Sequence, residues 1–238
     1  MIPWTLLDSA HMPGDGVLLS LYQRDTEFSI RAGNYELMNS RAYGSEETLA
    51  KLPCQKITQH PRARVLIGGL GMGYTVRSAL NELGAKAQVV VAELVTAVVQ
   101  WNRGFLADLA GNPLDDNRVT LHESNVAEMI KTAKGGYNAI LLDVDNGPQA
   151  LTLKDNDWLY SLGGLETAFA ALQPKGVLAI WSSGSDAAFA KRLGQAGFDV
   201  DEVGVRGRVG GKGAQNIVWI AMRKDNGVRL HGQGQAVA

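Results

Sequence analysis

From residue 63 onward the sequence repeats one unit, in which a short apolar run is followed by a glycine-containing turn and a helix-forming stretch. Buried parallel strands read as continuous apolar runs, and parallel neighbours need a crossover helix between them. The expected strands are 63–68, 88–92, 119–121, 139–142 and 177–181, and the expected helices are 74–83, 94–109, 126–134, a segment within 156–172, and 186–196. This alternation predicts an open, mostly parallel sheet with helices on both faces.

The two ends of the chain depart from this repeat. Four short β-prone runs, 6–7, 17–22, 27–31 and 35–38, are separated by turn signals and predict an antiparallel unit of hairpins. A short helix is expected from Ser45 to Pro53. The runs 198–205 and 217–222 are joined by a loop too short for a crossover helix, so they should pair antiparallel. The predicted organisation is an N-terminal β unit in 1–60, a doubly wound α/β domain with a seven-stranded sheet in 61–224, and a flexible tail in 225–238.

Composition excludes several classes of protein. The chain has 238 residues and a formal net charge of −1, so it offers no bulk attraction for nucleic acid or anionic lipid. One cysteine cannot form an internal disulfide, and the four histidines show no metal-ligand spacing. The N-terminus lacks a signal-peptide pattern, and no apolar run approaches membrane-spanning length. We therefore expect a cytoplasmic protein that binds no metal, no nucleic acid and no membrane.

The glycine-rich segment 67–74 follows an expected strand and opens an expected helix. Glycines at such a turn leave no Cβ between the backbone amides and a ligand at the helix N-terminus. A dinucleotide fingerprint counted from Gly69 would place its third glycine at position 74, but the glycine falls at Gly73. The observed spacing of Gly69, Gly71 and Gly73 is typical of S-adenosylmethionine sites. A plain connector between strand and helix is the alternative.

Acidic residues follow two of the expected strands. Glu93 ends the second strand, where a carboxylate can accept both hydroxyls of a ribose. Asp143 and Asp145 follow the fourth strand. Two carboxylates placed close together push one pKa upward, which suits a general base. The alternatives are an exposed strand-end acid for Glu93 and a turn-forming Asp pair at 143 and 145.

Several segments carry a resemblance to a known family. Residues 114–119, LDDNRV, resemble the LDDPRV segment of spermidine synthases, the polyamine aminopropyltransferases. Residues 65–69, 91–93, 137–143 and 171–178 fall where that family has its glycine loop, ribose acid, fourth strand and run into the fifth strand. The resemblance covers residues 15–222 and includes the N-terminal β unit. It implies a class I S-adenosylmethionine-dependent methyltransferase fold.

The resemblance also implies a role for each matching residue. The glycine loop would line the methionine portion of the cofactor, and Glu93 would hold its ribose. Asn125 stands where the family has an Asp near the adenine amine, and its amide oxygen can accept the same hydrogen bond. Val126 would pack on the adenine. The expected cofactor contacts are therefore Gly69, Gly71, Gly73, Glu93, Asn125 and Val126, and the expected catalytic residues are Asp143 and Asp145.

The sequence departs from the family on the substrate side. Gly71 stands where the family's glycine loop has an Asp, and the loop that begins at residue 143 is two residues shorter. Residues 44–47 stand for the family's Tyr-His/Gln-Glu segment, which helps shape the amine site, and Trp181 replaces a polar residue at the end of the fifth strand. From their positions, Tyr35, Tyr43 and Trp158 are expected to wall the substrate pocket.

The expected function is that of a spermidine synthase-like transferase in polyamine biosynthesis. It would use S-adenosylmethionine or decarboxylated S-adenosylmethionine to move a methyl or aminopropyl group to a small amine-type acceptor, in a homodimer. Two alternatives stay open. One is an S-adenosylmethionine-dependent methyltransferase of unknown acceptor, and the other is a non-catalytic nucleoside-binding dimer.

Overall fold

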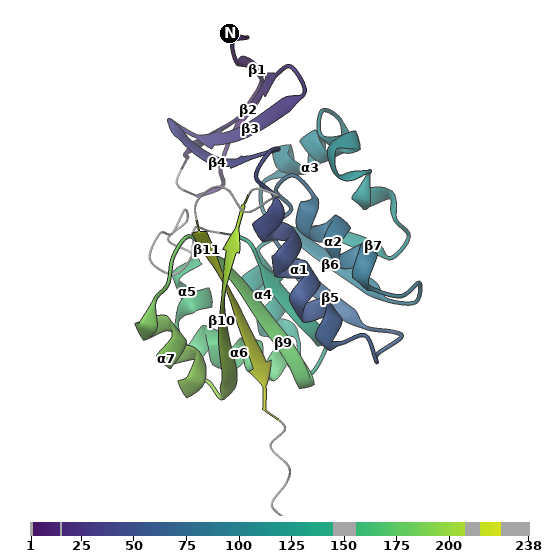
Figure 1. Cartoon of the computed structure of the whole chain (residues 1–238), viewed down its shortest axis with the longest axis vertical. Helices are drawn as coiled ribbons and strands as arrows, with labels where there is room; N and C mark the ends of the chain where they lie inside the picture. The colour runs from purple at the N-terminus through teal and green to yellow at the C-terminus, as the bar shows by residue number, and fades with distance from the viewer. Residues whose placement is uncertain (1, 15, 145–155, 208–214, 225–238) are drawn as a thin grey trace, which may run out of the picture.

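The computed structural model describes residues 2–14, 16–144, 156–207 and 215–224, and these form two β-sheets (Figure 1). The smaller sheet is antiparallel, with strand order β1-β2-β3-β4. The larger sheet has seven strands in the order β10-β11-β9-β8-β5-β6-β7. The strands β9, β8, β5, β6 and β7 run parallel to one another. Strand β11 is antiparallel to both of its neighbours, β9 and β10. The predicted fold class is therefore confirmed.

The bounds of the elements follow the sequence pattern closely. The small sheet contains β1 (Thr5–His11), β2 (Leu18–Arg24), β3 (Glu27–Ala32) and β4 (Tyr35–Asn39). The large sheet contains β5 (Arg64–Gly68), β6 (Gln88–Glu93), β7 (Val119–Glu123), β8 (Tyr137–Leu142), β9 (Leu172–Ser182), β10 (Phe198–Arg206) and β11 (Gln215–Arg223). The helices are α1 (Gly44–Lys56), α2 (Tyr74–Glu82), α3 (Thr96–Arg103), α4 (Val126–Thr132), α5 (Asp157–Tyr160), α6 (Leu162–Ala171) and α7 (Ala187–Gln195), with 3-10 helices at Ala107–Ala110 and Pro113–Asp115.

Side chains of the large sheet alternate between two cores. Val65 and Ile67 of β5 join the core that contains α1, α2 and α3, whereas Leu66 between them joins the core that contains α4, α6 and α7. Because both faces of the sheet are covered, both sets of side chains are apolar. This arrangement explains why the strands show continuous apolar runs in the sequence.

Two helices differ from their predicted extents. The helix predicted to end at Pro53 continues to Lys56, because Pro53 is buried with Leu49 and Cys54 and this packing outweighs one lost backbone hydrogen bond. The single helix predicted for 94–109 is divided in the structure. α3 ends at Arg103, and Gly104 takes φ −126° and ψ −104°, outside the helical region, before a 3-10 helix begins at Ala107.

The small sheet lies at one end of the large sheet, and α1 links the two (Figure 1). Although α1 follows the small sheet in the chain, it packs against α2, β9 and β11. The indole N–H of Trp101 in α3 donates to Asp8 Oδ2 of β1 at 2.7 Å, which fixes the small sheet to the helical layer. Within the described residues, no helix is long and apolar enough to cross a membrane.

Candidate functional site

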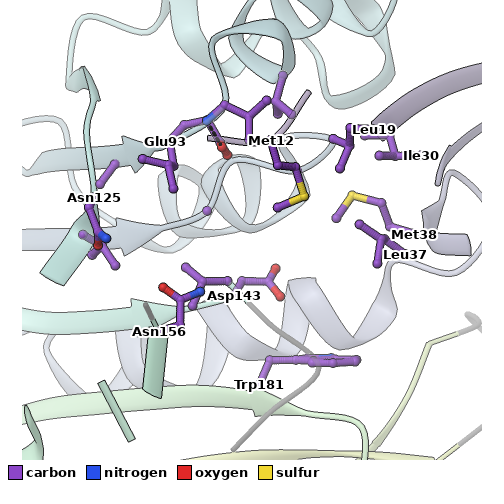
Figure 2. Close-up of a pocket in the computed structure, with 18 of the residues that line it drawn as sticks. Met12, Leu19, Ile30, Leu37, Met38, Glu93, Asn125, Asp143, Asn156 and Trp181 are labelled. Atoms are coloured by element: carbon purple, nitrogen blue, oxygen red, sulfur yellow. Dashed lines mark hydrogen bonds between the residues drawn. The ribbon is translucent and has the colours of Figure 1, made fainter. Parts of the chain in front are cut away.

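A cavity lies between the small sheet and the edge of the large sheet where the parallel strands end (Figure 2). In open parallel sheets this edge is the usual place for ligands. The large sheet contributes a residue at or just after the end of each of five strands, namely Gly69, Glu93, Asn125, Asp143 and Trp181. The small sheet and the turn after β1 contribute Met12, Leu19, Ile30, Leu37 and Met38.

Glu93 is the most enclosed acid of the cavity, with 7% of its surface exposed. Its Oε2 accepts the backbone N–H of Leu70 at 2.8 Å, and its Oε1 accepts that of Val95 at 2.8 Å. Burial raises the pKa of Glu93 above its ordinary range, and the N–H groups of Val95 and Leu70 oppose this shift. Each carboxylate oxygen has a second lone pair, so Glu93 can hold the glycine loop and a ligand hydroxyl together.

Two of the three predicted loop glycines line the cavity. Gly69 has φ +88°, and a Cβ there would lie 2.3 Å from the backbone oxygen of Asp143. Gly71 has φ +53°, and a Cβ there would lie 3.1 Å from both Sδ and Cε of Met38. Gly73, with φ +82°, is not among the lining residues, and a Cβ there would meet α3 and the two 3-10 helices. Gly73 therefore shapes the entry into α2. At Gly69 and Gly71 the missing Cβ lets the loop approach the Asp143 backbone and the Met38 side chain closely at the cavity wall.

Asn125 and Val126 lie together at the start of α4. Asn125 Oδ1 accepts the backbone N–H of Ala127 at 2.8 Å and so caps the helix, which occupies one lone pair of the oxygen predicted to face a base. Val126 packs so closely on β5 that a Cβ at Gly68 would lie 2.9 Å from its Cγ2. Both residues line the cavity, where Val126 offers an apolar surface to a flat ring.

Two further acidic residues line the cavity. Asp143 follows β8, and its Oδ2 accepts the hydroxyl of Thr75 at 3.2 Å. Glu46 comes from the first turn of α1, and its Oε2 accepts the hydroxyl of Ser45 at 2.6 Å. Burial raises the pKa of Asp143 to about 6. Burial and the charge of Asp143 raise the pKa of Glu46 to about 7, so this pair can exchange a proton with a ligand near neutral pH.

The sequence did not identify Glu46 as a site residue. The signal was present, because residues 44–47 stand where the resembled family has its Tyr-His/Gln-Glu segment. The apolar residues supplied by the small sheet were also missed. They come from strands far from the glycine loop in the sequence, and no local spacing links the two.

The three residues predicted to wall the substrate pocket do not line the cavity. Tyr35 is 80% exposed on β4, and Tyr43 stacks on Tyr74 with the ring centroids 4.4 Å apart. The ammonium of Lys131 lies 4.7 Å from the ring centroid of Trp158. Asp145, the second predicted catalytic acid, lies outside the described residues. Across the described ranges, no group of three or more His, Cys, Asp or Glu residues could hold a metal ion.

No protein-family model and no curated protein matches this sequence. Solved structures do match the fold. A spermidine synthase in complex with the transition-state analogue AdoDATO aligns with a TM-score of 0.71 and 16% identity, over 92% of this chain and 72% of that one. The spermidine synthase from Thermotoga maritima aligns over the same shares, with a TM-score of 0.73 and 16% identity. A probable spermidine synthase from Corynebacterium glutamicum gives 0.64 and 14% identity, over 92% of this chain and 79% of that one. The chain therefore has a spermidine synthase-like fold, as the resemblance predicts.

Proposed function

We propose that this protein is a spermidine synthase-like transferase. It binds S-adenosylmethionine or its decarboxylated form and moves an aminopropyl or methyl group to an amine-type acceptor. The observation that carries the proposal is that Glu93, Asn125, Val126 and Asp143 open into one cavity beside the glycine loop. The structural neighbour in complex with AdoDATO supports a nucleoside in the corresponding place.

The lining residues fit such a nucleoside. Glu93 accepts the ribose hydroxyls with its remaining lone pairs, and Asn125 and Val126 receive the base. Gly69 and Gly71 line the cavity, where their backbone can contact the chain attached to sulfur with no side chain of their own in between. Asn125 and Glu93 lie on one side of Asp143 in Figure 2, so a nucleoside held by them directs its 5′ end towards the Asp143 carboxylate.

The residues near Asp143 then prepare the acceptor. Bound sulfonium supplies an activated carbon, and transfer breaks its C–S bond with the electron pair left on sulfur. Asp143 takes a proton from the amine, which frees the nitrogen lone pair to form the new C–N bond. The hydroxyl of Thr75 holds the carboxylate in place. Because the carbon on sulfur is already activated, the main task of the site is to align the amine nitrogen with that carbon. We propose Asp145 as a second catalytic carboxylate from its sequence position alone.

A second candidate is methyl transfer from intact S-adenosylmethionine, and the missing acid at Gly71, which lies beside Met38, favours it. The resembled aminopropyltransferases have an Asp in the glycine loop, and here a thioether fills that space. A non-catalytic nucleoside-binding dimer is the third candidate. It would retain Glu93 and tolerate loss of Asp143.

Product analysis separates these candidates. The full chain would be incubated with each nucleoside and a panel of amines, and mass spectrometry would distinguish an added aminopropyl from an added methyl group. Asp143→Asn and Asp145→Asn should keep nucleoside binding and lower turnover by about 100-fold or more. Unchanged turnover would remove the altered residue from the catalytic role. No product with any amine would favour the non-catalytic candidate.

We also propose a homodimer formed through the small sheet. Analytical ultracentrifugation of the full chain tests it, and a monomer at micromolar concentration would contradict it.

A further inference from the structure

The wall of the cavity on the far side of Asp143 from Asn125 is apolar. In Figure 2, Leu37 and Met38 lie together there with Leu19 and Ile30 above them, and the ring of Trp181 lies below Asp143. Met12 completes the wall near Glu93. Leu19 and Ile30 are almost fully buried, at 4% and 2% exposed. The apolar wall is therefore the part of the packed core that borders the cavity.

The wall reaches the glycine loop itself. A side chain at position 71 would begin 3.1 Å from the thioether of Met38, which is tighter than ordinary van der Waals contact. An acid at position 71 would therefore require the end of the Met38 side chain to shift by a few tenths of an ångström. Where the resembled family has an acid in its glycine loop, this chain has the apolar end of the Met38 side chain next to Gly71.

Two of the three described carboxylates of the cavity act on one another. Among the described lining residues, the carboxylates are Glu46, Glu93 and Asp143. Glu93 already accepts two backbone N–H groups on the nucleoside side. The other two lie close enough for the charge of Asp143 to act on Glu46. Within the described residues, the cavity therefore offers one anionic position to an acceptor, and a second cation placed along the wall would lose its hydration with no described carboxylate beside it.

We propose that the acceptor is an amine with a single cationic head and an apolar body. The head lies between Glu46 and Asp143, and the body lies along Leu37, Met38 and the Trp181 ring. This inference rests on the proposed function and names its substrate class. A diamine of the same length would place its second ammonium against the side chains of the small sheet.

Calorimetry on the full chain saturated with methylthioadenosine tests the proposal with butylamine, hexylamine and 1,6-diaminohexane. Hexylamine should bind roughly tenfold more tightly than butylamine, because each buried methylene strengthens binding about three- to fourfold. The diamine should bind at least about tenfold more weakly than hexylamine, since its second charge is desolvated. Tighter binding of the diamine, or equal binding of the two monoamines, would overturn the proposal.

Paired variants locate the two ends of the acceptor. Glu46→Gln should weaken the binding of hexylamine about tenfold, because the ammonium loses a charged hydrogen bond. Glu47→Gln is the matched control, because the neighbouring Glu47 pairs with Arg77 and does not line the cavity. Met38→Glu should strengthen diamine binding about tenfold relative to the uncharged Met38→Gln. Equal hexylamine affinities of the two Glu variants would overturn the placement of the head.

These outcomes are separable from failure of the proposed function. If wild-type protein does not bind methylthioadenosine, the proposed function falls and this inference falls with it. If methylthioadenosine binds and the monoamines show no advantage, the inference alone is overturned.

Discussion

At the scale of single residues, Glu93 has a structural role, and we propose that it also binds the ribose. Glu93→Ala should weaken methylthioadenosine binding by about 1–3 kcal/mol, because the ribose loses a charged acceptor. It should also lower the free energy of unfolding by a similar amount, because the N–H groups of Leu70 and Val95 lose their buried partner. Calorimetry and urea unfolding measure the two effects. Glu93→Gln, which keeps one acceptor oxygen, is the control and should lose less in both.

The pair of Glu46 and Asp143 makes stability depend on pH. Their pKa values are raised to about 7 and about 6, so the folded state binds more protons than the unfolded chain between about pH 4 and pH 7. These groups therefore stabilise the fold at low pH, and the contribution is lost as the pH rises through the raised values. Urea unfolding should show Glu46→Gln gaining stability relative to wild type from pH 5 to pH 8. A difference that stays constant over this range would contradict the assignment.

At the scale of elements, the junction between the β5 loop and the end of β8 depends on Gly69. An alanine there would need φ +88° and would place its Cβ 2.3 Å from the backbone oxygen of Asp143. Gly135 is the matched control, because it has φ +57° and no atom within 4 Å of a built Cβ. Urea unfolding should show a loss of about 1 kcal/mol for Gly135→Ala and about 3 kcal/mol or more for Gly69→Ala. Equal losses would show that the close approach to Asp143 has no energetic weight.

Most elements could be predicted from the sequence because their signals are local. The apolar runs of β5, β6 and β8 and the glycine turn before α2 mark buried strands and a helix entry without knowledge of their neighbours. The continuation of α1 through Pro53 could not be predicted, because burial against the large sheet decides it. The division of 94–109 at Gly104 depends likewise on how the chain turns after α3.

At the scale of the whole molecule, one half of the proposed site follows from local sequence signals, and the other half depends on long-range packing. The proposed nucleoside side consists of strand ends, so topology alone brings Glu93, Asn125 and Asp143 to one edge of the sheet. The acceptor side depends on how the small sheet and α1 dock over that edge. Met38 therefore joins the cavity through long-range packing that no motif spacing encodes, whereas Glu46 lies in the segment 44–47, for which the resembled family provides a signal.

The central claim is that the cavity between the two sheets holds a sulfonium nucleoside or its thioether product. Calorimetric titration of the full chain with S-adenosylmethionine, its decarboxylated form and methylthioadenosine tests it most directly, with Glu93→Ala measured in parallel. We expect at least one of the three to bind wild-type protein and to bind the variant more weakly. No binding of any of the three to wild-type protein would contradict the claim.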